Sequence, residues 1–213
     1  NIITTVSILG RTYSPSSAPV QLINVPQYVS PTISGIVTCP AWNGTIGGVV
    51  AIDATGTIIL NANINVNGLG FRGAVRVFTA TWPAHLTDYL GPYSPDRFAA
   101  KGEGIAGYGM PPNTSGRGAP ANGGGGGNAV NAGGGGGSNF GCGGTGGYGY
   151  NHPTYGFNAN NIGIGGYPLT YSNPINKIFL GGGGGAGHDN NNEAVDAANG
   201  GGIVIITTNA ISG

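Results

Sequence analysis

Runs of consecutive glycine are the feature that most constrains what this chain can fold into. The tracts "NGGGGGN" at 122–128, "AGGGGGS" at 132–138 and "LGGGGGAG" at 180–187 lie in a glycine-rich zone that spans 122–202. Glycine contributes 46 of the 213 residues, and it loses more conformational freedom on folding than any other residue. Such tracts therefore either stay a flexible linker or require a fold in which only glycine fits.

The composition between the runs favours an ordered zone. Flexible linkers are usually Gly/Ser mixtures, whereas large apolar side chains recur here, and each one left exposed forfeits about 1.5–3 kcal/mol relative to burial. Polyproline-II-type helices, with about three residues per turn, can bond side by side where their faces are glycine. We therefore predict a bundle of polyglycine II helices, with disorder as the alternative. The large apolar residues of the zone are Phe140, Tyr148, Tyr150, Tyr155, Phe157, Ile162, Ile164, Tyr167, Ile178, Phe179 and Leu180.

The two ends of the chain have the pattern of β-strands. In "TIILNANINVNG", apolar residues alternate from Ile58 to Val66 and asparagine fills most positions between them, which is typical of a half-buried strand. "GGVVAIDATGTI" from Gly47 matches "GGIVIITTNAI" from Gly201 at its apolar positions. This internal repeat predicts equivalent strands, either neighbours in one sheet or adjacent rungs of a solenoid.

The predicted fold is one extracellular all-β domain covering 1–213, with almost no α-helix. Residues 1–80 and 200–213 are expected to form the scaffold, a short-strand sandwich or a β-solenoid. Residues 79–121 are expected to form a Pro- and Tyr-rich loop region, and 122–202 the inserted bundle of polyglycine II helices.

Several function classes are disfavoured by composition. Seven basic residues balance seven acidic ones and form no basic cluster, which argues against nucleic-acid binding. No run of 18 apolar residues is present, so no membrane span is expected. The three histidines lack metal-ligand spacing, and the glycine runs lack the Lys-Ser/Thr of a phosphate-binding loop.

The most site-like stretch is "GHDNNNEAVDAANGG" at 187–201. Asp189, Asn191, Glu193 and Asp196 concentrate side-chain oxygens there, which makes them candidate ligands for Ca²⁺. The alternative is a hydrated connecting loop in which Asx residues turn the chain. No other cofactor is expected.

The two cysteines, Cys39 and Cys142, are far apart in sequence. A single disulfide between them is possible if the protein is secreted, and two buried free thiols are equally compatible with the sequence. In "AKGEG" we expect Lys101 and Glu103 to form a pair at a surface turn.

Tyrosine is the main candidate for ligand contact. With Asn and Gly, it supplies rigid contact area and adaptable hydrogen bonds. Tyr89, Tyr93, Tyr108 and Tyr155 are the candidate binding surface. The alternative is that the tyrosines clamp the ends of the glycine bundle.

The motifs "GRGAPANGGGGGNAVNAGGGGGSN", "KGEGIAGYG" and "IFLGGGGGAGHDNN", with "PAWNG" and "NVNGLGFRG" before them, resemble a glycine-rich region of large secreted surface proteins of Bacteroidota. The resemblance covers about residues 20–213. It implies an extracellular, adhesin-like part of a multidomain protein that is exported by the type IX machinery. The glycine runs are more loosely similar to the polyglycine II domains of phage tail-fibre adhesins and to the glycine-rich ectodomain of the anaplastic lymphoma receptor kinase.

Together these features predict a non-enzymatic cell-surface adhesin or stalk module. Its expected partners are a cell-surface glycan or protein ligand, or copies of itself. The alternative is a subunit of a self-assembling extracellular filament. A weaker alternative is a carbohydrate-active enzyme on a β-helix.

Overall fold

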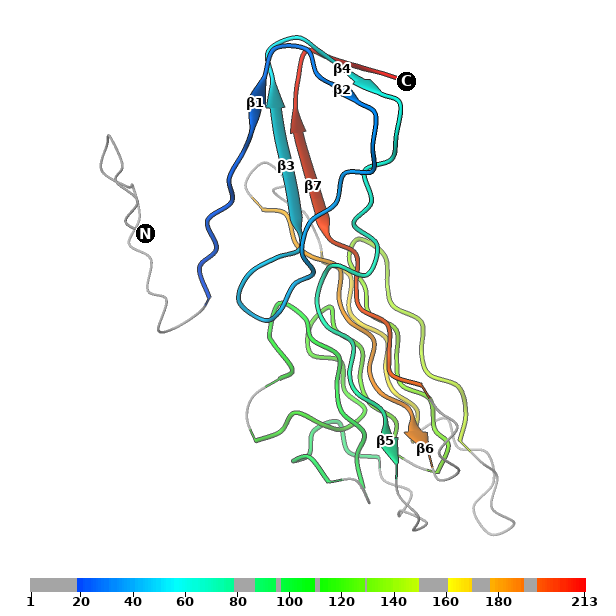
Figure 1. The fold of residues 1–213 in the computed structure, drawn as a ribbon. Helices are drawn as coiled ribbons and strands as arrows, with labels where there is room; N and C mark the ends of the chain where they lie inside the picture. The colour runs from blue at the N-terminus through cyan, green and yellow to red at the C-terminus, as the bar shows by residue number, and fades with distance from the viewer. Residues whose placement is uncertain are drawn as a thin grey trace.

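The computed structural model is elongated, with the longer strands at one end and glycine-rich segments at the other (Figure 1). It describes residues 19–78, 87–94, 97–109, 112–128, 130–149, 161–169, 177–189 and 195–213. These residues contain almost no helix, and their sheets are small and parallel, which confirms the all-β class. None of them belongs to a helix with the length and apolar character needed to cross a membrane.

Two three-stranded parallel sheets form the strand-bearing end. One contains β1 (Gln27–Tyr28), β3 (Val49–Ala54) and β7 (Ile203–Thr207), in that order, and the other contains β2 (Thr32–Ile33), β4 (Thr57–Leu60) and β8 (Ala210–Ser212). Each strand of the first sheet leads through a short corner into a strand of the second. The pairs β1–β2, β3–β4 and β7–β8 are therefore three stacked layers (Figure 1).

The internal repeat forms neighbouring strands. β3 pairs with β7 in the register Val49↔Ile203 and Val50↔Val204, and the same offset continues along both strands. The prediction of sheet neighbours is confirmed. β7 joins this sheet only after the chain has passed through the whole glycine-rich zone. The β3–β7 pair therefore brings together the two parts of the chain that flank this zone.

The apolar core lies between the two sheets. Its buried members are Ile33, Val50, Ile52, Ala54 and Ile58. Leu60, Ala62, Ile64 and Val66 pack against this cluster, whereas Asn61, Asn63 and Asn65 are exposed. The predicted alternation is therefore confirmed. The strand β4 itself ends at Leu60, and the residues after it are held by isolated backbone hydrogen bonds, such as Val37 N–H to Asn63 O (3.0 Å).

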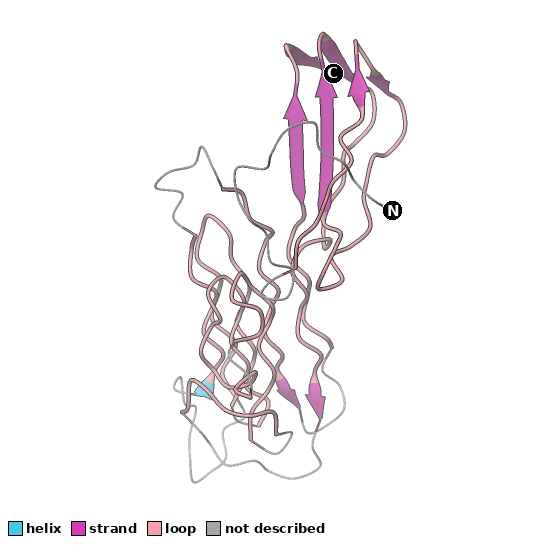
Figure 2. Ribbon diagram, turned by 90° about the vertical axis from the view of Figure 1, so that its left-hand side faces the viewer, coloured by secondary structure: helices cyan, strands magenta, loops and turns pink. Residues whose placement is uncertain are grey.

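Beyond the two three-stranded sheets, the chain runs back and forth in extended segments that are almost entirely outside regular strands (Figure 2). We call these segments the glycine-rich body, and they are 69–76, 99–104, 115–118, 122–128, 132–138, 142–149, 161–167, 180–188 and 196–202. Backbone N–H···O bonds between different segments hold the body together. The network thus reaches outside the 122–202 zone and takes in parts of the expected scaffold and loop region.

The hydrogen-bond partners in the body change with a period of three residues. Along 181–186, successive N–H groups donate in turn to the segments 196–202, 132–138 and 99–104, and the cycle then repeats, with N···O distances of 2.8–3.0 Å. The N–H groups of 124–128 follow the same rule with their own three neighbours. Each central segment is therefore bonded to neighbours all around it.

Glycine is required where these backbones approach each other. A Cβ atom on Gly125 would lie 1.9 Å from Arg117 O, and one on Gly182 would lie 1.8 Å from Asn122 O. At the outer segment 142–149 the requirement recurs only at some positions, since a Cβ atom added to Gly144 or Gly147 would have nothing within 4 Å. The glycine runs are thus a packing requirement of the interior.

Candidate functional site

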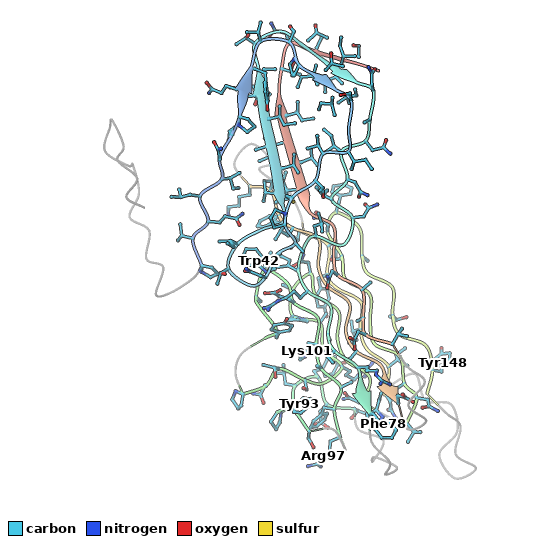
Figure 3. All side chains as sticks on the ribbon, viewed as in Figure 1. Trp42, Phe78, Tyr93, Arg97, Lys101 and Tyr148 are labelled. Atoms are coloured by element: carbon cyan, nitrogen blue, oxygen red, sulfur yellow. The ribbon has the colours of Figure 1, made fainter. Side chains whose placement is uncertain are left out.

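An exposed aromatic loop, residues 87–94, is the strongest candidate for ligand contact. Tyr89, Leu90 and Tyr93 are about 60% exposed, and Figure 3 places Tyr93 and Arg97 in the half of the molecule away from the two three-stranded sheets. Exposed apolar and aromatic groups gathered on one loop are typical of contact surfaces.

A buried lysine fixes the backbone of this loop. The Lys101 side chain is only 1% exposed, and its Nζ donates to Tyr89 O at 2.7 Å and also to Gly118 O. Burial lowers the pKa of the Lys101 amine to about 8, because desolvation disfavours the charged form. Lys101 therefore joins the loop to the glycine-rich body from the inside.

Further bonds tie the loop to the body. The buried Asn128 amide donates to Asp88 O at 2.7 Å, Gly118 N–H donates to Tyr89 O at 3.0 Å, and Gly91 exchanges backbone bonds with Ser115. These bonds hold the loop backbone at Asp88, Tyr89 and Gly91. The aromatic side chains are consequently presented from an anchored loop.

Arg117 connects the aromatic surface to the interior. Its guanidinium carbon lies 5.1 Å from the centre of the Tyr89 ring, within the range of a cation–π contact. Its Nε donates to Ile162 O at 3.2 Å. Tyr89 is thus held on one side while more than half of the side chain stays exposed.

A second polar cluster lies where the strands meet the glycine-rich body. The buried carboxylate of Glu103 accepts hydrogen bonds from Arg72 Nε and N–H (both 3.0 Å) and from Trp42 Nε1 (3.1 Å), and Figure 3 shows Trp42 at this junction. Arg72 Nη1 also donates to Asn43 O. The expected Lys101–Glu103 pair is therefore wrong, because Glu103 is engaged by Arg72 and Lys101 by backbone carbonyls.

The four candidate tyrosines do not share one surface. Tyr89 and Tyr93 lie on the exposed loop, whereas the Tyr108 ring packs under Arg72 at 5.4 Å and belongs to the junction cluster. Burial and the nearby Glu103 carboxylate raise the pKa of Tyr108. Tyr155 lies outside the described residues.

Two of the four candidate calcium ligands meet an arginine. Asp189, in the short strand β6 (His188–Asp189) that pairs with β5 (Val77–Phe78), lies 3.7 Å from Arg76 Nη1. Asp196 Oδ1 accepts the Arg76 backbone N–H at 2.9 Å. Asn191 and Glu193 lie outside the described residues, and no cluster of three or more His, Cys, Asp or Glu ligands occurs within the described ones. The calcium site stays a prediction.

Both cysteines are free. Cys39 packs against the core between the sheets, and burial raises the pKa of its thiol. Cys142 is exposed on the segment 142–149 of the glycine-rich body. The candidate disulfide is not formed, since the two residues belong to these different parts of the fold.

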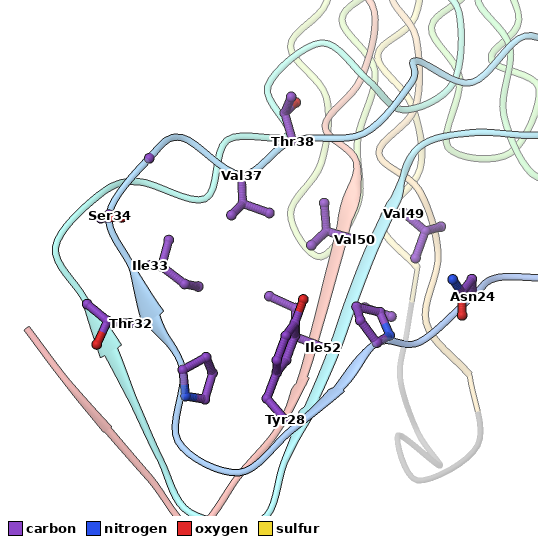
Figure 4. A pocket seen from close by; sticks show the side chains of 14 residues that line it. Asn24, Tyr28, Thr32, Ile33, Ser34, Val37, Thr38, Val49, Val50 and Ile52 are labelled. Atoms are coloured by element: carbon purple, nitrogen blue, oxygen red, sulfur yellow. The ribbon is translucent and has the colours of Figure 1, made fainter.

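An apolar hollow of about 480 Å³ lies beside the first layer of strands. Figure 4 shows Tyr28, Ile33, Val37, Val50 and Ile52 around it. It lies next to β1, an edge strand of its sheet. No charged side chain from the described part of the chain lines the hollow, so its walls suit apolar contact rather than acid–base chemistry.

Sequence reasoning missed the buried polar residues that organise these sites. Lys101, Asn122 and Asn128 are fully buried or nearly so, although each is a residue type usually found at the surface. One signal was available: asparagine stands at both ends of the run "NGGGGGN". Comparison of the chain with protein-family models, with curated proteins and with solved structures gives no match.

Proposed function

We propose that the chain is a non-enzymatic, adhesive module of a secreted or cell-surface protein. In this proposal a short β-solenoid carries a bundle of polyglycine II helices, which presents the 87–94 loop to a glycan or protein ligand. The observation that carries the proposal is the anchoring of the loop that bears exposed Tyr89 and Tyr93, because the buried Lys101 donates to Tyr89 O and to Gly118 O of the glycine-rich body.

Two features of the backbone support this architecture. The three stacked layers have the parallel, in-register pairing expected of solenoid rungs. Partners that recur every three residues in the glycine-rich body match a helix of about three residues per turn that bonds only to its neighbours. The surface location and export by the type IX machinery rest on the resemblance of the glycine-rich motifs.

A binding measurement with matched tyrosine variants tests the adhesive function. The ligand class is screened with glycan arrays and whole bacterial or host cells, using the purified chain. Replacing Tyr89 and Tyr93 together with Ala should reduce binding at least tenfold, because both rings belong to the exposed loop. Tyr148→Ala is the control, since Tyr148 is 61% exposed, as Tyr93 is, but lies on another segment. Equal loss in both variants, or no binding by the wild-type chain, contradicts the proposal.

A self-assembling filament is the second candidate. β7 and β8 are edge strands, and their sequences "IVIIT" and "AIS" contain neither the charges nor the proline that commonly protect an edge. Val204, Ile205 and Ile211 are also partly exposed there. If copies pair through this edge, sedimentation should detect polymers that Val204→Lys disperses, whereas a monomer at all concentrations argues against the filament.

A further inference from the structure

One side of the glycine-rich body contains a groove that is lined mainly by glycine. Its volume is about 670 Å³, and its walls are the segments 134–142, 181–185 and 197–201. The central segment 181–186 donates to two of these walls, the first and the third, on either side of the groove. The groove therefore follows one side of a segment that is bonded to neighbours on its other sides.

The groove interrupts the three-residue cycle of hydrogen bonds. Along 133–138, Gly133 and Gly136 donate to the 142–149 segment, and Gly135 and Ser138 donate to the 122–128 segment. The third direction would belong to Gly134 and Gly137, whose N–H groups have no partner among the described residues. Two unpaired donors, three residues apart, thus share one direction.

Acceptors on the central segment match these donors. The carbonyls of Gly181, Gly183, Gly184 and Ala186 accept N–H groups from the segments 69–76 and 122–128. Gly182 O and Gly185 O accept none within the described part of the chain, although both glycines are buried. Gly182 O lies against the Cα of Gly137, and Gly185 O lies against the Cα of Gly134. Gly183 O lies against Gly102 in the same way and still accepts a hydrogen bond, so this close contact does not block an acceptor.

We propose that the groove is an empty position in the bundle and that it binds an extended glycine-rich segment of a partner polypeptide. The segment would accept hydrogen bonds from Gly134 and Gly137 and donate to Gly182 and Gly185. It must carry N–H groups, so a pure polyproline chain would not satisfy the carbonyls. It must also have glycine on the buried side, because the neighbouring backbones of the body admit no Cβ where they are this close.

Gly184 provides a way to close the groove without disturbing the body. A Cβ at Gly184 would contact Ala197 Cβ at 3.4 Å and Gly135 O at 3.7 Å, both ordinary contacts, and Gly184 itself lines the groove. A larger side chain there fills the space between the walls. Gly147→Leu is the matched control, because a side chain at Gly147 meets nothing within 4 Å and Gly147 does not line the groove.

The test is titration of the ¹⁵N-labelled chain with the peptide acetyl-(Gly-Gly-Ser)₃-amide, followed by NMR. The expected result is saturable binding with shifts and slowed exchange at the Gly134 and Gly137 N–H groups. Binding should weaken at least tenfold in Gly184→Leu and stay unchanged in Gly147→Leu. Acetyl-(Ala-Ala-Ser)₃-amide, which carries methyl groups on the buried side, should not bind.

Three results would overturn the assignment. The first is no saturable binding at peptide concentrations up to about 10 mM. The second is binding that survives in Gly184→Leu. The third is self-association that Gly184→Leu abolishes, which would make a second copy the occupant. The inference rests on the bundle architecture within the proposed function. Protected amides in 124–127 without peptide binding reject the groove alone, whereas unprotected amides there reject the bundle as well.

Discussion

Replacing Gly125 with alanine places a methyl group where another backbone already lies. The new Cβ would sit 1.9 Å from Arg117 O, and real Cβ atoms essentially never approach another atom closer than 3.0 Å. The two segments must therefore separate by at least 1.1 Å, the difference between 3.0 and 1.9 Å. Both segments are hydrogen-bonded to further segments of the glycine-rich body, so this shift must displace other backbone as well.

The energetic cost follows from the hydrogen bond that joins these two segments. Gly126 N–H donates to Gly116 O at 2.9 Å, and both residues are buried. A separation of this size takes the bond out of hydrogen-bonding range and leaves both groups unpaired. Leaving buried polar groups unpaired costs about 1–3 kcal/mol each, so Gly125→Ala should lower the free energy of unfolding by about 2–6 kcal/mol.

Gly144→Ala is the matched control on the outer segment 142–149. A Cβ there has nothing within 4 Å, and Gly144 is not among the glycines with positive φ. Alanine at such a position should stabilise the fold by about 0.4–1 kcal/mol, because it restricts the unfolded chain. The two substitutions, chemically identical, should therefore change stability in opposite directions.

Differential scanning calorimetry with urea titration measures both variants. For a chain of this length, each kcal/mol changes Tm by about 2–4 °C. Gly125→Ala should melt several degrees or more below the wild type, and Gly144→Ala slightly above it. Wild-type stability in Gly125→Ala, or equal losses in both variants, would refute the close-packing argument.

Three further substitutions probe the buried polar residues. Raising the pH from 7 to 9.5 should increase the free energy of unfolding by about 2 kcal/mol through Lys101. The amine has a pKa of about 8 when folded and about 10.4 when unfolded, so the unfolded state binds more protons in this window. Urea titrations at each pH should find this gain missing in Lys101→Met. Glu103→Ala should lower the free energy of unfolding by about 2–4 kcal/mol, because it leaves Arg72 and Trp42 without their shared acceptor; an unchanged urea midpoint would contradict this role. Asn122→Ala should lower the free energy of unfolding by about 2–4 kcal/mol, because the buried amide bonds the Ser138 and Leu180 carbonyls and the Ile105 N–H. If calorimetry shows a smaller loss than for the exposed Asn63→Ala, these bonds do not have that role.

The strand-bearing end was predictable because its pattern is local. Alternation from Ile58 to Val66 sorts side chains onto two faces, and the paired motifs at Gly47 and Gly201 identify strands that pair across the whole glycine-rich zone. Periodicity reports which side of a strand is buried. It does not report where regular pairing stops, so the end of β4 at Leu60 was not foreseen.

The polar anchors could not be predicted because their partners are backbone atoms distant in sequence. Lys101 meets the Tyr89 and Gly118 carbonyls, and Glu103 meets Arg72 across the junction. The closeness of Lys101 and Glu103 in "AKGEG" favours a local pair, but in this extended segment the two side chains contact different partners. Runs of glycine are also identical in sequence, so they give no indication of which glycines line an open groove.

Residue-resolved amide hydrogen exchange of the glycine-rich body tests the central claim most directly. The N–H groups of Gly133, Gly135 and Gly136 should be protected, because each has a carbonyl partner at 2.8–2.9 Å. Those of Gly134 and Gly137 should exchange rapidly, because they have no partner among the described residues. This pattern of protection, broken at every third residue, is what a bundle of helices with about three residues per turn predicts. Complete exchange of the whole 133–137 run within seconds, or protection without that pattern, would contradict the account.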